Sequence, residues 1–117
     1  MSMPHRISFK HAISGLGYVF KNHPNVKVHG LVGLMAIIAG WVLEISTGEW
    51  LIISFTIVLV MMAELVNTAI ESMTDLITTE YRQKAKVAKD VSAGMVLVTA
   101  VGAVIVGLVI FLPKIVS

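Results

Sequence analysis

Hydrophobic residues gather in three blocks along the chain, separated by short polar stretches. The blocks lie at about 29–46, 50–70 and 91–112. A helix needs about 20 apolar residues to cross a bilayer, with a usable range of roughly 17 to 25. The third block is long enough alone, and the second reaches this length if its helix runs through Ile70. The pattern predicts three membrane-spanning helices, with a buried or tilted helix as the alternative for the shorter first block.

The segment before the first block, at about 5–22, has a different pattern. Its apolar residues recur near helical spacing, with basic residues between them: Ile7, Phe9, Ile13, Leu16 and Phe20. This spacing predicts an amphipathic helix that lies on the cytoplasmic membrane surface. A disordered tail is the alternative.

Composition agrees with a membrane protein. The chain has 117 residues, of which 56% are hydrophobic and 14% charged, and its mean hydropathy is +0.88. An ordinary soluble domain has roughly a quarter charged residues. We expect a single all-α membrane domain over 1–117. There is no cysteine, so neither a disulfide nor a thiolate metal site is possible. No basic, aromatic-interleaved patch indicates nucleic-acid binding.

The positions of the basic residues predict an orientation. Lys and Arg precede the first block and recur between the second and third: Arg6, Lys10, Lys21, Lys27, Arg82, Lys84, Lys86 and Lys89. The connection between the first two blocks, "EISTGEW", has two Glu and neither Lys nor Arg. The positive-inside rule then places the N-terminus and the 71–90 segment in the cytoplasm of a multi-pass cell-membrane protein.

Small residues recur in the first and third blocks and favour close helix packing in lipid. They are Gly33, Ala36, Gly40, Gly94, Gly102, Ala103 and Gly107. Three helices enclose little polar space, so we expect a homo-oligomer with sites between subunits.

Polar residues follow one face of the second helix towards the cytoplasm. At 100° per residue, Glu64, Asn67, Glu71 and Asp75 lie within about 80° of one another. Glu64 lies roughly 21 Å along the axis from Trp50, which leaves it inside a hydrocarbon core about 30 Å thick. An ionisable residue at this depth usually marks function. The alternative for Glu64 is an interhelical hydrogen bond that holds an oligomer together.

The spacing along this stripe separates two tasks. Glu64 and Glu71 lie about 10.5 Å apart along the axis, so they do not readily bind one ion together. One lies at lipid depth and the other at the water boundary. Glu64 is well placed to take a proton from a lipid hydroxyl, and Glu71 to hold a divalent cation on a phosphate donor.

Basic residues after the stripe provide countercharge. Phosphoryl transfer depends mainly on positioning and on neutralising the moving group with cations. We favour Lys89 and Asp90 as functional, whereas Lys84 and Lys86 fit topology signals. Asp90 has the alternative of a helix N-cap. Neither of the common phosphate-binding motifs, the P-loop or the kinase glycine-rich loop, is present.

Two motifs, "AELVNTAIESMTD" and "AKVAKDVSAGMVLV", together resemble the signature of the prokaryotic membrane diacylglycerol kinase family. The resemblance covers nearly the whole chain. It implies ATP- and Mg²⁺-dependent phosphorylation of a membrane lipid alcohol by a homotrimer with sites between subunits. It also implies that Glu64 is the general base, Asn67 its polar neighbour and Glu71 a metal ligand. Other active-site and nucleotide positions implied in this way are His11, Asp75, Glu80, Tyr81, Arg82, Lys89 and Asp90.

One position departs from the family pattern. The family has a second metal-binding Glu just ahead of the first span, and this chain has His23 there. Mg²⁺ commonly keeps few protein ligands, whereas a His suits softer ions. His23 is therefore an expected second metal position.

The lipid acceptor is a separate question. The segments "NVKVHG" and "VIFLPKI" look more like the Gram-positive branch, whose members resemble undecaprenol kinases. We therefore favour undecaprenol over diacylglycerol. Alternatives of other classes are a small transporter with an embedded Glu, and a scaffolding subunit whose charges serve topology and assembly.

Overall fold

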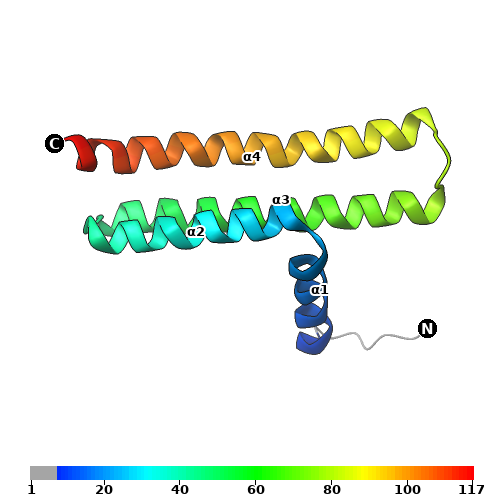
Figure 1. Cartoon of the computed structure of the whole chain (residues 1–117), viewed down its shortest axis with the longest axis horizontal. Coiled ribbons are helices and arrows are strands. Elements are labelled where there is room, and N and C mark those ends of the chain that lie inside the picture. The colour runs from blue at the N-terminus through cyan, green and yellow to red at the C-terminus, as the bar shows by residue number, and fades with distance from the viewer. Residues whose placement is uncertain (1–7) are drawn as a thin grey trace.

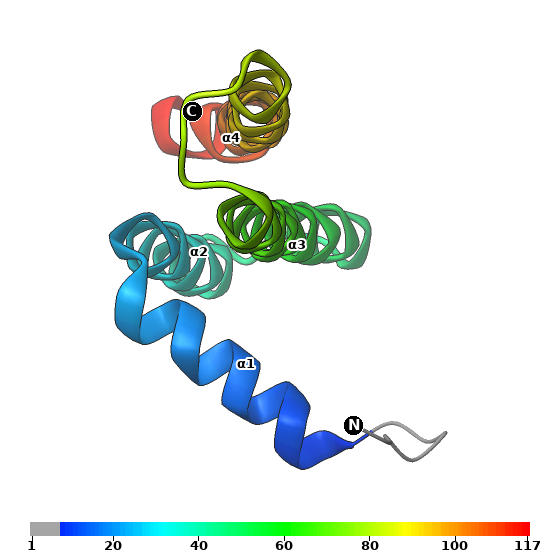
Figure 2. The same ribbon diagram turned by 90° about the vertical axis from the view of Figure 1, so that its right-hand side faces the viewer.

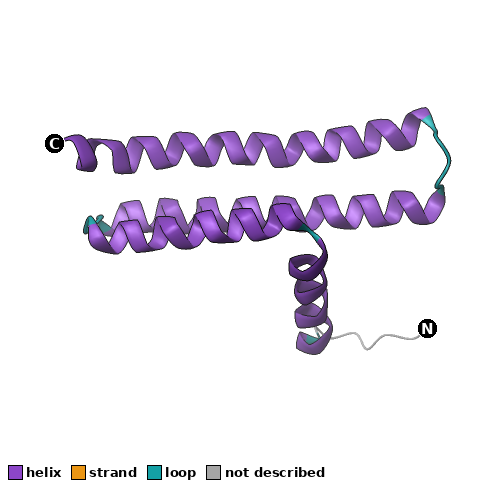
Figure 3. Ribbon diagram, viewed as in Figure 1, coloured by secondary structure: helices purple, strands orange, loops and turns teal. Residues whose placement is uncertain are grey.

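A computed structural model describes residues 8–117, and within this range the chain is all-helical. Its elements are α1 (Phe9–Asn22), α2 (Pro24–Val42), α3 (Thr47–Ile77) and α4 (Gln83–Val116). The last three lie lengthwise beside one another, and α1 projects from the start of α2 (Figure 1). Only short loops join these helices (Figure 3). Residues 5–7 of the predicted surface helix lie outside the described range.

The junction between α1 and α2 is a sharp bend. Pro24 opens α2, a position where its missing N–H and fixed φ are compatible with a helix. Val19 and Val26 are buried at the bend. Figure 2 shows α1 leading away from the three long helices. Most of the apolar residues of α1 therefore remain exposed, including Phe9 and Ile13.

The end of the bundle at residues 43–46, here called the turn end, is closed by apolar packing. Ile45, Ile53 and Ile110 form a buried cluster that joins the turn to α3 and α4. Ser46 and Glu49 form a capping box: the Glu49 N–H donates to Ser46 Oγ (3.2 Å), and the Ser46 N–H donates to Glu49 Oε1 (2.9 Å). These bonds satisfy orphan amides at the helix start. The apolar block at 29–46 thus includes the turn that ends α2.

The glycines of α2 and α4 have different surroundings. A Cβ added at Gly33 would lie 3.4 Å from Ile57, and one at Gly40 would lie 2.7 Å from the Trp50 ring. These two glycines allow α2 to approach α3 closely. Within residues 8–117, the glycines of α4 have no neighbour of this kind within 4 Å: Gly94, Gly102 and Gly107.

The three long helices differ in length, and α3 and α4 are much longer than α2. At 1.5 Å per residue, the 19, 31 and 34 residues of α2, α3 and α4 extend about 28, 46 and 51 Å. Each is long and apolar enough to cross a membrane. A hydrocarbon core about 30 Å thick accommodates α2 alone, so α3 and α4 must extend beyond it. The three helices are those of a multi-pass membrane protein, and α3 and α4 are longer than a crossing requires.

The extension of α4 corrects one expectation from the sequence. The helix begins at Gln83, with Arg82 as the residue before it, so Asp90 lies inside the helix. The alternative that Asp90 is only an N-cap is wrong. Residues 83–90 favour helix because they are mainly Lys, Ala and Gln, which are strong helix formers.

Candidate active site

Asn67 links α3 to α4 through its side-chain amide. Ser92 Oγ, on α4, donates to Asn67 Oδ1 at 2.6 Å, and Asn67 Nδ2 donates to Glu71 Oε1 at 3.1 Å. Ser92 is 2% exposed. Since both ends of the amide are used, its orientation is fixed and its N–H points to the carboxylate. The stripe of α3 is therefore held against α4 by a polar chain from Ser92 to Glu71.

Glu64 lies deeper along the same helix and is almost fully buried, with 3% exposure. Its Oε1 lies 2.8 Å from Nδ1 of His29, in the second turn of α2. The contact is close, but within the described residues neither atom has a hydrogen bond of acceptable geometry. Nearby Thr68 donates to the Glu64 backbone carbonyl at 3.0 Å and not to the carboxylate. The carboxyl group thus keeps acceptor capacity for a further donor.

Beyond the stripe, the ends of α3 and α4 and the loop between them form a charged region, here called the pocket end. Lys89 Nζ lies 2.6 Å from Asp75 Oδ1, which joins α4 to α3. Arg82 and Glu80 pair at 3.0 Å within the loop, and Lys86 pairs with Asp90 along α4. The side chains of all three pairs are exposed. Exposed ion pairs contribute little stability, so these groups can exchange partners readily.

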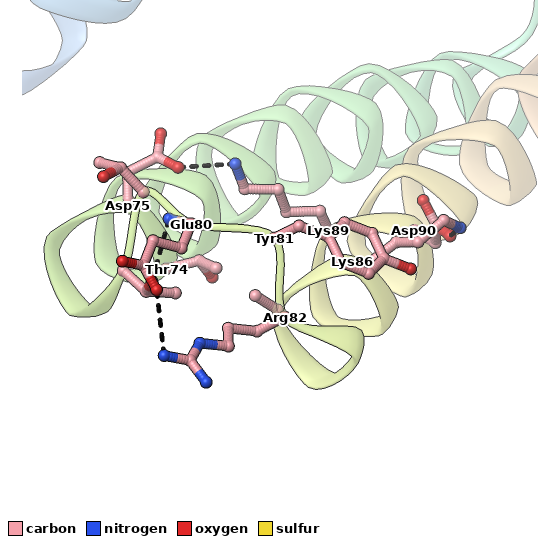
Figure 4. Close-up of a pocket in the computed structure, with 11 residues that line it drawn as sticks. Thr74, Asp75, Glu80, Tyr81, Arg82, Lys86, Lys89 and Asp90 are labelled. Carbon is pink, nitrogen blue, oxygen red and sulfur yellow. Dashed lines mark hydrogen bonds and ion pairs between the residues drawn. The ribbon is translucent and has the colours of Figure 1, made fainter.

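A pocket of about 360 Å³ opens between these charges. Figure 4 shows Asp75 and Lys89 on one side and Arg82 with Glu80 on another. The lining is Thr74, Asp75, Thr78, Thr79, Glu80, Tyr81, Arg82, Ala85, Lys86, Lys89 and Asp90. Cationic donors suit phosphate oxygens, and carboxylates suit a hard divalent cation. The pocket therefore has the chemistry of a site for a metal-bound polyphosphate.

Six positions named from the sequence meet at this pocket: Asp75, Glu80, Tyr81, Arg82, Lys89 and Asp90. Glu64, Asn67 and Glu71 continue from it along α3. Tyr81 hydroxyl donates to Gln83 Oε1 at 3.0 Å, which ties the loop to the start of α4.

The two histidines predicted as site residues, His11 and His23, do not line this pocket. His11 is in the first turn of α1, where its backbone N–H donates to Ser8 Oγ at 3.4 Å. His23 lies at the bend before α2, with its ring edge-on to Tyr18 at a centroid distance of 6.2 Å. Over residues 8–117, no group of three His, Asp or Glu is close enough to hold a metal. His11 and His23 are therefore not part of a metal-binding group within the described part of one chain.

Sequence reasoning missed two polar residues of the site. His29 is an ionisable residue at the start of an apolar block, and the rule that singled out Glu64 would also have singled it out. Ser92 lies inside the second motif, three residues after Lys89. Small hydroxyl residues are common in membrane helices, so a serine at this position does not by itself indicate a site. The structure was needed to show its contact with Asn67.

Comparison with known proteins identifies the family of this chain. The family model for prokaryotic diacylglycerol kinase matches residues 10–111. The chain is 43% identical over 107 residues to the undecaprenol kinase of Bacillus subtilis, covering 92% of this chain and 87% of that protein.

Two further relatives are named diacylglycerol kinases. The Synechocystis protein is 39% identical over 112 residues, and this chain, matched over 95% of its length, spans 64% of that longer relative. The Escherichia coli protein is 29% identical over 104 residues, covering 83% of this chain and 85% of the relative. The chain therefore belongs to the prokaryotic diacylglycerol kinase family of lipid kinases.

Proposed function

We propose that this chain transfers the γ-phosphoryl group of ATP to undecaprenol at the cytoplasmic face of the cell membrane. The observation that carries this proposal is Glu64, a carboxyl group with 3% exposure at membrane depth, on the helix that leads to the charged pocket. The undecaprenol kinase of Bacillus subtilis, 43% identical to this chain, supports the choice of acceptor.

The orientation follows from the charge distribution. Basic residues cluster at the pocket end and in the N-terminal segment, which favours the cytoplasmic side for both. On this orientation α1 lies on the cytoplasmic surface, and its exposed Phe9, Ile13 and Leu16 insert into the headgroup boundary. ATP, a cytoplasmic solute, then reaches the pocket from water while the lipid reaches Glu64 from the bilayer.

In the reaction, Glu64 accepts the proton of the lipid hydroxyl. The hydroxyl oxygen attacks the γ-phosphorus, the bond from that phosphorus to the β-phosphate oxygen breaks, and ADP leaves with the electron pair. Asn67 keeps Glu71 in place through the 3.1 Å hydrogen bond. Lys89 releases Asp75 and turns its ammonium group to the transferring phosphoryl group, where positive charge lowers the barrier.

The nucleotide occupies the pocket near Glu80, Tyr81 and Arg82, with Asp90 and His11 as further contacts. Glu71 would hold Mg²⁺, which neutralises phosphate charge. The donor set fits a hard cation. Only one oxygen of Glu71 accepts the hydrogen bond from Asn67, which leaves the other for the metal, and the Asp75 carboxylate lies one turn further along α3. Phosphate oxygens and water complete the usual shell of this ion.

Two features extend beyond a single chain. We propose a homotrimer with sites between subunits, in which His11 and His23 of one chain approach the pocket of another. The glycines of α4 support this, because no described residue of the same chain packs against them and a helix of a neighbouring chain can therefore approach closely. His23 is proposed as the second metal position. Measuring activity with Mn²⁺ in place of Mg²⁺ tests whether a site that contains His23 prefers a softer ion.

Diacylglycerol is the second candidate acceptor, because two relatives are named for it. Purified protein in lipid, given labelled ATP and Mg²⁺ with undecaprenol or diacylglycerol in parallel, separates the two. We expect label to enter undecaprenol far faster. Faster labelling of diacylglycerol would overturn the acceptor but keep the chemistry.

The role of Glu64 is tested with Glu64→Gln in the same assay. A lost general base lowers turnover by roughly 10²- to 10⁴-fold. Nucleotide binding, measured by fluorescence of a labelled ATP analogue, should stay within about twofold because the pocket residues are unchanged. Equal loss of turnover and nucleotide binding in a folded variant would contradict the assignment.

A further inference from the structure

His29 and Glu64 form the deepest polar contact of the site. The imidazole comes from α2 and the carboxyl from α3, and Nδ1 lies 2.8 Å from Oε1. The carboxyl side chain is 4% exposed and the imidazole 23%. Both contacting atoms are buried and, within residues 8–117, lack a well-aligned hydrogen bond.

Such an arrangement is expensive unless it has a use. A buried carboxylate is stable only with a partner that compensates its charge, and the other polar side chains near it are already engaged. Thr68 bonds to backbone, and Asn67 bonds to Glu71 and Ser92. His29 is therefore the side chain available to orient Glu64. Hydrogen bonds of catalytic groups are often misaligned before substrate binds and become aligned afterwards.

We propose that His29 is a positioning residue for phosphoryl transfer: its Nδ1 holds Oε1 of Glu64 so that the carboxylate faces the lipid hydroxyl. The proposal rests on the proposed function, in which Glu64 takes the hydroxyl proton. His29 is not among the residues that line the pocket proposed for the nucleotide. His29 lies in the second turn of α2, the helix whose length matches the thickness of the bilayer. Its contact therefore holds Glu64 near the membrane boundary.

The two nitrogens of the imidazole allow a matched test. The amide nitrogen of Asn occupies nearly the place of Nδ1, and that of Gln nearly the place of Nε2. If the contact from Nδ1 matters, His29→Asn keeps it and His29→Gln loses it. The two variants are otherwise alike in polarity, so their difference reports the position of one nitrogen.

The experiment measures kcat and the KM values for ATP and undecaprenol in His29→Ala, His29→Gln and His29→Asn. A misplaced catalytic group costs up to about 100-fold in rate, so we expect the Ala and Gln variants to lose roughly 10- to 100-fold in kcat. His29→Asn should recover most of this loss. The KM for ATP should stay nearly constant in all three, because the pocket is formed by residues 74–90.

A double variant separates this proposal from the function on which it rests. In a Glu64→Gln background, His29→Ala should cause no further loss, since a residue that acts only through Glu64 has nothing left to act on. If Glu64→Gln is itself fully active, the proposed base is wrong. If Glu64→Gln is slow but His29→Ala is fast, or the two losses multiply, the positioning role is wrong. The positioning role would also be wrong if the Asn and Gln variants had the same kcat. It would be wrong as well if all three variants lost thermal stability in proportion to their loss of rate.

Discussion

The two ends of the α3–α4 pair are held together in different ways: each has an ion pair between the helices (Glu49–Lys114 at the turn end), but the turn end adds a buried apolar cluster. At the turn end, Ile53 and Ile110 meet Ile45 of the turn in a buried apolar cluster. At the pocket end, the same two helices meet through Asp75 and Lys89, an exposed ion pair around an open pocket. One pair of helices thus has a closed end and an open one.

The difference indicates a division of labour along the helices. Apolar packing has few alternatives, and it fixes the crossing of α2, α3 and α4 close to the turn. Exposed charges add little stability but are ready to exchange partners with an incoming ligand. Between the ends, Glu64 contacts α2 and Asn67 contacts α4. Substitutions at the two ends should therefore have separable effects on stability and on turnover.

Of the substitutions that compare the two ends, Lys89→Met at the pocket end should have the largest effect. Removing one preorganised group that stabilises transition-state charge lowers kcat by roughly 10²- to 10³-fold. Lys86→Met is the matched control: it removes the same charge from the same pocket, but its partner is Asp90 on its own helix. Steady-state kinetics in lipid should show a much smaller change for Lys86→Met. Equal losses would mean that the pocket needs only net positive charge.

The next effect is expected at the turn end. An added methyl at Gly40 would meet the Trp50 ring at 2.7 Å and the Ile45 side chain at 3.0 Å. Ile45 belongs to the buried cluster, and Trp50 packs against it. Overpacking of this kind costs roughly 1–3 kcal/mol. Gly40→Ala should therefore unfold at lower temperature in detergent than Gly48→Ala, whose added methyl meets nothing within 4 Å.

Turnover at a permissive temperature sharpens the same comparison. The folded fraction of Gly40→Ala should retain kcat close to that of the parent protein, because no residue of the pocket end contacts the cluster. A kcat that falls with stability would show that the two ends are not separable.

Much of this architecture was accessible from the sequence, for identifiable reasons. Membrane helices leave their hydrophobic pattern in the sequence, and the stripe from Glu64 to Asp75 follows from helical period alone. Predicting the contact of Lys89 with Asp75 requires the length of the loop between α3 and α4. The N-cap alternative for Asp90 was wrong because the hydrophobic pattern does not mark where a polar helix begins. The apolar pattern ends where the helix leaves the membrane, but the helix continues because its polar residues have high helix propensity.

Contacts between helices were the part that the sequence did not predict. His29 and Glu64 are 35 positions apart, and their meeting depends on how far α2 overlaps α3. That overlap is set by Gly33 and Gly40, whose role in packing was expected, but not their partners Ile57 and Trp50. Small-residue patterns predict that helices approach, not which turn faces which.

A smaller effect is expected from the cap at the turn end. Ser46→Ala removes the hydroxyl that accepts the Glu49 N–H, and loss of an N-cap costs about 1 kcal/mol. Ser46→Thr keeps a hydroxyl and should retain most of the stability. Thermal unfolding in detergent measures both. Equal destabilisation by Ala and Thr would show that the turn depends on the size of the side chain and not on its hydrogen bond.

An effect of similar size should come from the middle of the pair, at Ser92. Ser92→Ala removes the 2.6 Å hydrogen bond to Asn67 Oδ1 and frees the amide to rotate away from Glu71. A hydrogen bond of this kind is worth about 0.5–1.5 kcal/mol, so kcat should fall by up to roughly tenfold. Thr99→Val is the control, because the Thr99 hydroxyl on the same helix donates only to the backbone carbonyl of Val96.

Kinetics at varied Mg²⁺ distinguish a positioning role for Ser92 from a packing role. If Ser92 acts through Asn67 on Glu71, Ser92→Ala should need more Mg²⁺ for half-maximal rate, and Thr99→Val should not. A variant that unfolds more easily but keeps the Mg²⁺ requirement would make the Ser92–Asn67 bond part of the packed structure. In that case the boundary between the stable and the reactive parts of α3 and α4 would lie closer to the pocket, between Asn67 and Glu71. A raised requirement would instead place that boundary on the turn-end side of Asn67, with the amide and its hydroxyl partner belonging to the reactive end.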